Sequence, residues 1–330
     1  MRRIFRFAVA LCLVLAAAAG AAVLWEIAWL AAPGPLVSGS TIVIDRGQSA
    51  GAIGRQLAQA GIITPDFAFA PAVWATRFEG VLRPGEYAFS AAITPQGVID
   101  LLRSGKTVVH RLVVPEGLTT AEILVLVEHG EALAGDLTER PGEGRLWPAT
   151  YSYSFGDKRQ GLIDHMTKLA AQNLVALWSG RDADLPIDRP EQAVTLASIV
   201  EKETAIPAER PKIAAVLYNR LRLGMKLQMD PTVVYAVTEG RHPLDHPLTH
   251  AELEIESPYN TYLVKGLPPG PIGNPGRAAL EAVLKPEHSN LLYFVADGSG
   301  GHAFAATLEA HNRNVAHWRE VEAERAGVGK

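Results

Sequence analysis

The residues from Phe7 to Trp25 restrict the fold of this chain more than any other segment, because none of these 19 residues is charged or strongly polar. As a helix that rises about 1.5 Å per residue, the segment would be about 28 Å long, close to the thickness of a bilayer's hydrocarbon core. Arg2, Arg3 and Arg6 precede it. By the positive-inside rule, the short N-terminus then stays in the cytoplasm and the rest of the chain is exported.

Two interpretations of this apolar segment remain open. Its length favours a membrane anchor, which we expect over residues 7–30, behind a cytoplasmic tail of residues 1–6. A cleaved signal peptide usually has an apolar region of only about 7–15 residues, although the small residues at 17–22 could hold a cleavage site. The bulk of the chain lies outside the cytoplasm in both cases. The N-terminal position and the flanking arginines argue against a buried core helix.

The composition excludes several classes of protein. With 330 residues, 31 basic and 35 acidic side chains and a net charge of −4, the chain lacks the basic excess of a nucleic-acid binder. Cys12 is the only cysteine, so there is neither a disulfide framework nor a cysteine zinc site. His246 and His250 lie in HPLTH without the H-E-x-x-H pattern, so we predict no metal site and no cofactor.

A strand, a turn and a capped helix follow one another three times after a linker at residues 31–40. The three segments are TIVIDRGQSAGAIGRQLAQAG, GEYAFSAAITPQGVIDLLRSG and HRLVVPEGLTTAEILVLVEHG. Residues suited to cap the helices are Ser49, Thr94 before Pro95, and Thr119 or Thr120. The segments differ too much to form a repeat array. We predict a small α+β module over 41–110, whose strand–helix plan is similar to that of wall-binding LysM modules.

The remainder, residues 111–325, is expected to form a second, mixed α+β domain, followed by a tail at 326–330. Residues 131–144 have the composition of a loop, and helices are predicted at 160–178 and from about residue 190. A hairpin is expected from strands at 291–296 and 302–305 around DGSGG, before a last helix.

Glu203 is the strongest candidate for a catalytic residue. If residues 193–204 form a helix, Leu196, Ile199 and Val200 define an apolar stripe, and Glu203 continues it. Burial disfavours an ionised carboxylate and raises its pKa, and a glutamic acid that stays protonated near neutral pH can act as a general acid. The alternative is a helix-terminal glutamate that reaches water. Glu201 lies off the stripe and is expected to face solvent or the neighbours of Lys202.

Polar and aromatic residues further along the chain are candidates for binding a sugar. Residues 225–229 alternate apolar and polar side chains, as in a short strand with one polar face, while Asp230 before Pro231 is typical of a helix N-cap. His302 and His311 could orient a carboxyl group or simply pack. The rigid Gly- and Pro-rich segment 266–276 could line a cleft or serve as a connector. The expected substrate-binding residues are Gln228, Tyr259, Asn260, Thr261 and Tyr262.

Four segments in this order, behind an N-terminal membrane helix, resemble the endolytic murein transglycosylase family, also called YceG-like. They are LASIVEKET, ERPKIAAVLYNRLRLGMKLQMDPTVVYAV, SPYNTYLVKGLPPGPIGNPG and LYFVADGSGGHAF. The resemblance implies that the second glutamate of EKET, Glu203, is catalytic, that a LysM-like module precedes the catalytic domain, and that this domain holds a glycan cleft. One position departs from the family pattern, because EGRLWPATYSY has Ala149 where members carry an aspartate.

The activity implied by the resemblance is cleavage of the bond between N-acetylmuramic acid and N-acetylglucosamine in nascent peptidoglycan, leaving 1,6-anhydro ends. The implied setting is a single span in the bacterial inner membrane with the catalytic part in the periplasm. Glycan strands are the implied partners, with peptidoglycan synthases as further candidates and no nucleic acid. Two alternatives are a non-catalytic membrane-tethered scaffold that binds peptidoglycan and a hydrolytic muramidase.

Overall fold

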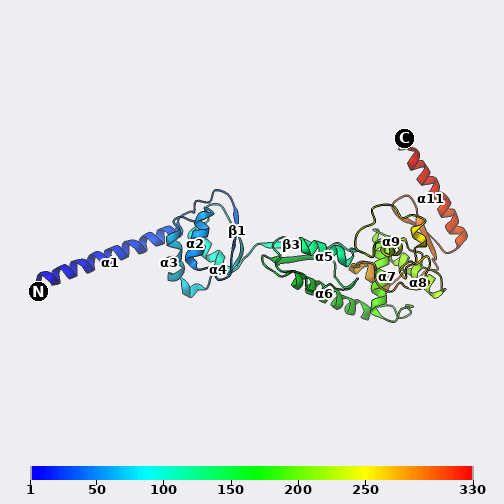
Figure 1. Ribbon diagram of the computed structural model, residues 1–330, viewed down its shortest axis with the longest axis horizontal. Coiled ribbons are helices and arrows are strands. Elements are labelled where there is room, and N and C mark those ends of the chain that lie inside the picture. The colour runs from blue at the N-terminus through cyan, green and yellow to red at the C-terminus, as the bar shows by residue number, and fades with distance from the viewer. Residues whose placement is uncertain (1, 329–330) are drawn as a thin grey trace. The chain divides into compact units, whose positions relative to one another are not determined.

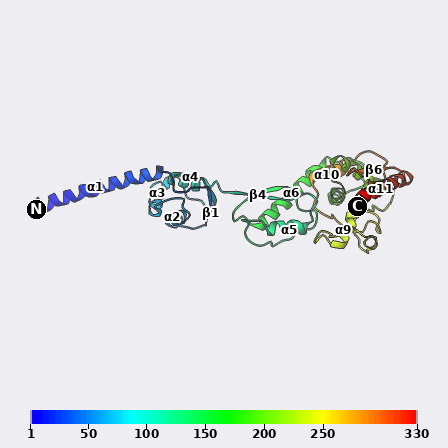
Figure 2. The same cartoon turned by 90° about the horizontal axis from the view of Figure 1, so that it is seen from above.

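The computed structural model describes residues 2–328 and divides them into two compact units (Figures 1 and 2). Unit 1 comprises residues up to 110 together with 132–134 and 152–157, and unit 2 comprises 111–131, 135–151 and the chain from 158 onward. Each unit mixes helices with one or more short strands, so the prediction of an α+β protein is confirmed.

Unit 1 begins with α1 (Arg2–Ala31), the long blue helix of Figure 1. By length and composition this helix could cross a membrane. It starts before the predicted 7–30 and includes the arginines expected to lie in a tail, because nothing at Arg2–Arg6 interrupts helical geometry. Near its end, Trp29 is buried in the core of unit 1, and its Nε1 donates to the carbonyl of Thr64 at 2.8 Å.

The rest of unit 1 is a strand–helix–helix–strand arrangement with one further helix. β1 (Ser40–Ile44) pairs antiparallel with β2 (Gly85–Phe89), and α2 (Ala50–Gln59) and α3 (Phe69–Ala75) lie between them in sequence. α4 (Pro95–Ser104) follows β2. The core of unit 1 is formed by apolar side chains such as Ile44, Leu57, Phe69, Tyr87, Phe89, Ile99 and Leu102.

The capping predictions are confirmed where side chains act locally. Ser49 accepts from the amide of Ala52 at the start of α2, and Thr94 accepts from Gly97 at the start of α4. In unit 2, Thr119 caps α5 (Thr120–Glu128) and forms a reciprocal capping box with Glu122. The helix α3 was not predicted, since its sequence FAPAVWA has no capping residue in front of it.

A second sheet pairs β3 (Val109–Val113) with β4 (Thr150–Ser154). The predicted helix at 160–178 is α6 (Arg159–Ser179). A hairpin of β5 (Tyr293–Ala296) and β6 (His302–Ala305) matches the predicted one, and α11 (Leu308–Val328) follows it. This helix continues into the predicted tail at 326–330, whose last two residues lie outside the described range. Short 3₁₀ helices are η1 (Asp66–Ala68), η2 (Arg77–Glu79), η3 (Pro207–Glu209) and η4 (Glu252–Glu254).

The core of unit 2 is built around α7 (Pro190–Glu203), which packs against α6, α8 (Arg210–Arg222), α9 (Asp230–Thr238) and α10 (Arg277–Leu284). Every residue of α7 from Ala193 to Val200 is buried. Because its last turn emerges from this core, α7 delivers the side chain of Glu203 from the interior of the unit to a pocket at its edge.

Candidate active site

Glu203 is the last residue of α7, and local sequence explains why the helix starts and stops where it does. Pro190 occupies the first turn, and the side chain of Gln192 accepts from the amides of Asp188 and Arg189. Thr204 takes an extended conformation that ends the helix. The prediction of a single apolar stripe is wrong in one respect, since α7 is buried on all sides from Ala193 to Val200 and not along one face.

Glu203 lines a pocket of about 310 Å³ that is rich in polar groups. Its Oε2 is buried and has no hydrogen-bond partner among the described residues. An unpaired buried carboxyl oxygen costs free energy, and such an oxygen is ready to bind a group that enters the pocket. The other lining residues are Arg220, Gln228, Met229, Asp230, Tyr262, Phe294, Val295, Ala296, His302, His311 and Val315.

Burial is the largest cause of a raised pKa at Glu203. It disfavours the charged form, the negative charge of Asp230 acts in the same direction, and the positive charge of Arg220 opposes both. The result is a pKa of about 7, compared with an ordinary value of 4.5. A large fraction of the molecules therefore keeps this proton near neutral pH, as a general acid requires.

Arg220 is held rigidly beside Glu203 by the backbone of two loops. The Nε atom donates to the carbonyl of Leu292 at 2.7 Å and Nη1 donates to that of Leu227 at 2.6 Å. Its guanidinium also faces the ring of Tyr293, 5.3 Å from the centroid. These bonds fix a positive charge near the carboxyl group of Glu203 without a direct ion pair, so the charge remains available to the carboxylate that forms after proton transfer.

Asp230 and Tyr262 form a hydrogen-bonded pair in the same pocket. The Tyr262 hydroxyl donates to Asp230 Oδ1 at 2.5 Å, which joins the start of α9 to a loop 32 residues later. Asp230 is therefore not the N-cap that its sequence context predicted; that position belongs to Met229, and Asp230 is the first helical residue. Burial, followed by the bond to Asp230, raises the pKa of the Tyr262 hydroxyl.

Asn260 and Thr261, predicted to bind substrate, are instead wholly buried and support Tyr262. Asn260 Oδ1 accepts from the amide of Tyr262, and its Nδ2 donates to the carbonyls of Leu253 and Ile255. Thr261 Oγ1 accepts from the amide of Met229 at 3.0 Å. Their polar atoms are satisfied within the protein, which leaves them to shape the loop and not to contact a ligand.

Gln228 lies in the pocket, but the segment that carries it is not the predicted strand. Its φ angle of 52° is left-handed, a conformation that costs a residue with a side chain roughly 1 kcal/mol. The amide of Gln228 donates to the carbonyl of Thr261, which pays part of that cost. The turn interrupts the apolar–polar alternation of residues 225–229 and directs the chain into α9.

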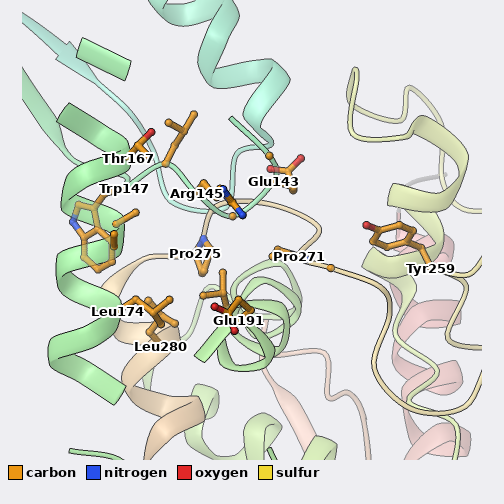
Figure 3. A pocket seen from close by; sticks show the side chains of 17 residues that line it. Glu143, Arg145, Trp147, Thr167, Leu174, Glu191, Tyr259, Pro271, Pro275 and Leu280 are labelled. Atoms are coloured by element: carbon orange, nitrogen blue, oxygen red, sulfur yellow. The ribbon is translucent and has the colours of Figure 1, made fainter. Parts of the chain in front are cut away.

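Tyr259 lies away from Glu203, in a different pocket of about 490 Å³ (Figure 3). In the figure, Trp147 and Leu174 stand on one side of that pocket and Tyr259 on the opposite side. Glu191 in the first turn of α7 also lines it, whereas Glu203 is at the other end of the helix, about 18 Å away at roughly 1.5 Å per residue. The structure thus places Tyr259 and Tyr262 in different pockets, and their binding of one ligand stays a prediction.

Glu201 is buried in a structural ion pair and does not face solvent as predicted. Its Oε1 accepts from Arg210 Nη2 at 2.7 Å, and its Oε2 accepts from the amide of Gly276 at 2.8 Å. Both carboxyl oxygens are thus occupied, whereas Glu203 keeps one free. This difference in hydrogen bonding favours Glu203 over Glu201 as the catalytic candidate more strongly than their positions on the helix do.

Two histidines that the sequence left undecided also line the pocket of Glu203. His302 donates through its backbone amide and Nδ1 to the two oxygens of Glu209, each at 2.7 Å. Burial would raise the pKa of Glu209, but the bonds from His302 and Thr204 outweigh it and keep this pKa low. The pair attaches the β5–β6 hairpin to the segment just after Glu203. His311 Nδ1 is buried without a partner among the described residues.

A further pocket of about 420 Å³ adjoins that of Glu203, since Asp230 lines both. Lys202, Val234, Leu244, His246 and Ile272 are among its other lining residues. Ile272 comes from the Gly- and Pro-rich segment, where Asn274 is fully buried and joins two loops through bonds to the amide of Leu146 and the carbonyl of Leu118. This segment therefore forms a pocket wall.

Together these features define an α+β protein with one proton-retaining glutamate at the end of a buried helix, in a polar pocket with an arginine and a tyrosine–aspartate pair. The sequence profile of the YceG-like family matches residues 42–317, and the chain belongs to this family.

Two named relatives and one solved structure are similar to this chain. The endolytic murein transglycosylase of Bacillus subtilis (strain 168) is 41% identical over 176 residues, which are 53% of this chain and 47% of that protein. The endolytic murein transglycosylase of Streptococcus pneumoniae (strain D39) is 39% identical over 181 residues, 53% of this chain and 32% of that protein. The chain thus spans about half or less of these relatives. The crystal structure of a YceG-like protein from Listeria monocytogenes is 31% identical, with a TM-score of 0.54, covering 84% of this chain and 98% of that one.

Proposed function

We propose that this chain is a membrane-anchored lytic transglycosylase that cleaves peptidoglycan strands internally. The observation that carries the proposal is Glu203, a buried carboxyl with a free oxygen and a pKa of about 7. The names of the Bacillus and Streptococcus relatives supply the substrate and the reaction class. The helix α1, long and apolar enough for a bilayer, supports a single inner-membrane span with the remaining chain in the periplasm.

The proposed reaction needs one carboxyl group. Protonated Glu203 donates to the oxygen that links C1 of N-acetylmuramic acid to N-acetylglucosamine, and the C1–O bond breaks. The 6-hydroxyl of the same muramyl residue then forms a bond to C1 and returns its proton to the Glu203 carboxylate. No water is consumed, and the product carries a 1,6-anhydro end. Tethering of the hydroxyl near C1 takes the place of a second catalytic carboxylate.

The surroundings of Glu203 support this sequence of proton transfers. Arg220 stabilises the carboxylate while it lacks its proton, and Asp230 and burial favour the return of the proton. Tyr262 and Gln228 are the proposed glycan contacts that remain from the predicted set, with Asn260 and Thr261 behind them. The two adjoining pockets that share Asp230 form the proposed glycan cleft. Release of glycan ends beside the synthases would end strand elongation.

We assign the proposed domains as an anchor and linker up to residue 40, a LysM-like module over 41–110 and a catalytic domain over 111–325. The strand–helix–helix–strand order of β1, α2, α3 and β2, with the two strands paired, supports the module assignment. Ala149 stands at the family's aspartate position, and its carbonyl accepts from the amide of Val114. A side chain is not needed for this contact, so the substitution is compatible with an active enzyme.

A hydrolytic muramidase is the second candidate, because Asp230 puts another carboxylate into the pocket. Its Oδ1 is occupied by Tyr262, which argues against a role in activating water. Mass analysis of the fragments released from purified glycan strands separates the two reactions. We expect anhydro ends, each lighter by one water than a reducing end. Reducing ends would identify a hydrolase, and binding without any release would identify a scaffold.

A further inference from the structure

Three large aromatic side chains of unit 1 are exposed within one short segment, residues 66–79, which we call the aromatic segment. Phe67 in η1 is 68% exposed, Trp74 in α3 is 67% exposed and Phe78 in η2 is 86% exposed. α3 buries Phe69 and Ala72 in the core of unit 1, which leaves Trp74 on its outer face. Single exposed apolar side chains are common, but several within one segment indicate a surface that binds a partner.

The first of these side chains contacts α1 at the level where the apolar part of that helix ends. The rings of Phe67 and Trp25 stack, with centroids 5.9 Å apart and an angle of 12° between their planes. Trp25 is the last residue of the apolar run that starts at Phe7, and Glu26 follows it. In a chain anchored by this run, Trp25 lies where the hydrocarbon core meets the headgroups, a level at which tryptophan is enriched. Phe67 then lies at the same level.

The end of α1 is packed into unit 1, so the unit keeps a fixed position relative to the helix. Trp29, one turn after Trp25, is buried in the core, and its Nε1 donates to the carbonyl of Thr64. The amide of Gly34 donates to the carbonyl of Ile93 at 3.1 Å. In Figures 1 and 2, α3 lies at the side of unit 1 from which α1 extends. The side of unit 1 that faces a bilayer crossed by α1 is thus the side that carries α3.

The two other exposed rings hold a cation between them. The guanidinium of Arg77 lies 4.3 Å from the ring centroid of Trp74 and 4.4 Å from that of Phe78. Aromatic side chains enter the boundary between headgroups and acyl chains, and an arginine beside them can pair with a lipid phosphate. The segment also carries Asp66 and Glu79, so Arg77 gives it no excess of positive charge. Its affinity for a membrane therefore depends on the rings and does not require an acidic lipid.

We propose that the aromatic segment lies in the headgroup region of the bilayer that α1 crosses, with Phe67, Trp74 and Phe78 as its contacts. The inference rests on the proposed membrane anchor. Exposed rings can also stack on sugars, but the contact of Phe67 with Trp25 favours a phospholipid surface, because it fixes one end of the segment at the bilayer boundary. The segment is then a second attachment to the membrane, beside α1, and holds one face of unit 1 on the bilayer.

The test uses the full-length chain in phosphatidylcholine vesicles, with Cys12→Ser removing its only cysteine. A fluorescent probe is attached either at Ala75→Cys, an exposed position next to Trp74, or at Arg46→Cys, an exposed control position after β1. In Figures 1 and 2, β1 lies at the side of unit 1 away from α1. We expect lipids with a spin label on the headgroup to quench most of the fluorescence at Ala75→Cys and little of that at Arg46→Cys.

Adding Trp74→Ser and Phe78→Ser to the Ala75→Cys chain should remove most of the quenching, because the segment loses two of its three contacts while α1 stays in the bilayer. Phe155→Ser, which removes an exposed phenylalanine outside the segment, should leave the quenching unchanged. Equal quenching at Ala75→Cys and Arg46→Cys, or quenching that survives the two serine substitutions, would overturn the proposal.

Two further outcomes separate the proposal from its alternatives. A probe at Ala75→Cys that responds to added glycan strands and not to the spin-labelled lipid would overturn the proposal and identify a glycan-binding surface. A chain that does not float with the vesicles in a density gradient would contradict the membrane anchor itself, which is a distinct result.

Discussion

Replacing Glu203 by glutamine lowers the kcat for release of glycan fragments by about 10²–10⁴-fold, the range that a general acid contributes. Glutamine has nearly the same shape and can enter the same pocket, but it has no proton to donate to the leaving oxygen and no carboxylate to receive one. The KM should change little, because binding depends on other groups. The rate is measured on purified strands by chromatography of the soluble products.

A matched control for this substitution is available on the same helix. Glu191 is exposed in the first turn of α7, and Glu191→Gln makes the same chemical change about 18 Å from Glu203. It should retain the wild-type rate. A Glu203→Gln variant that is active within a few fold of the wild type would exclude Glu203 as the acid and leave the pocket without an assigned proton donor.

The same substitution is expected to stabilise the folded protein at alkaline pH. The carboxyl of Glu203 ionises near 4.5 in the unfolded chain and near 7 in the folded protein. Between these two pH values the unfolded state releases a proton that the folded state keeps, so the free energy of unfolding decreases as the pH rises. At roughly 1.4 kcal/mol per pKa unit, the penalty in the wild type approaches about 3.5 kcal/mol above pH 7.

Glutamine carries no such penalty, so the difference in unfolding free energy between Glu203→Gln and the wild type should grow from pH 4.5 to 7 and then level off. Other titrating groups are common to both proteins and cancel in this difference. Urea denaturation at several pH values, monitored by circular dichroism, gives the measurement. Glu191→Gln should follow the wild type throughout. A difference that does not depend on pH would mean that Glu203 titrates alike in the folded and unfolded states.

Local rules predicted the parts of the fold that depend on neighbouring residues. Ser49, Thr94 with Pro95, and Thr119 with Glu122 act within one helical turn, so their caps could be identified from spacing alone. The predicted alternation at 225–229 failed because the left-handed turn at Gln228 is stabilised by Thr261, which is distant in sequence. The burial of α7 on every side between Ala193 and Val200 likewise depends on four other helices.

In the candidate site, too, features that depend on neighbouring residues could be predicted from the sequence, and features that depend on distant residues could not. Glu203 could be selected from its own helix, but the groups that set its pKa could not. Asp230 is joined to Tyr262 across 32 residues, and His302 is joined to Glu209 across 93. Asn260 and Thr261 have the composition of sugar-binding residues, yet three-dimensional packing uses their hydrogen bonds internally. Periodicity gives no information on such long-range contacts.

The protonation of Glu203 in the intact protein is the central claim of this account. It can be measured by following the chemical shift of its side-chain carboxyl carbon by ¹³C NMR as a function of pH, with the resonance assigned by its loss in Glu203→Gln. The account predicts a midpoint of about 7. A midpoint near 4.5, as for a glutamic acid in open solvent, would contradict it.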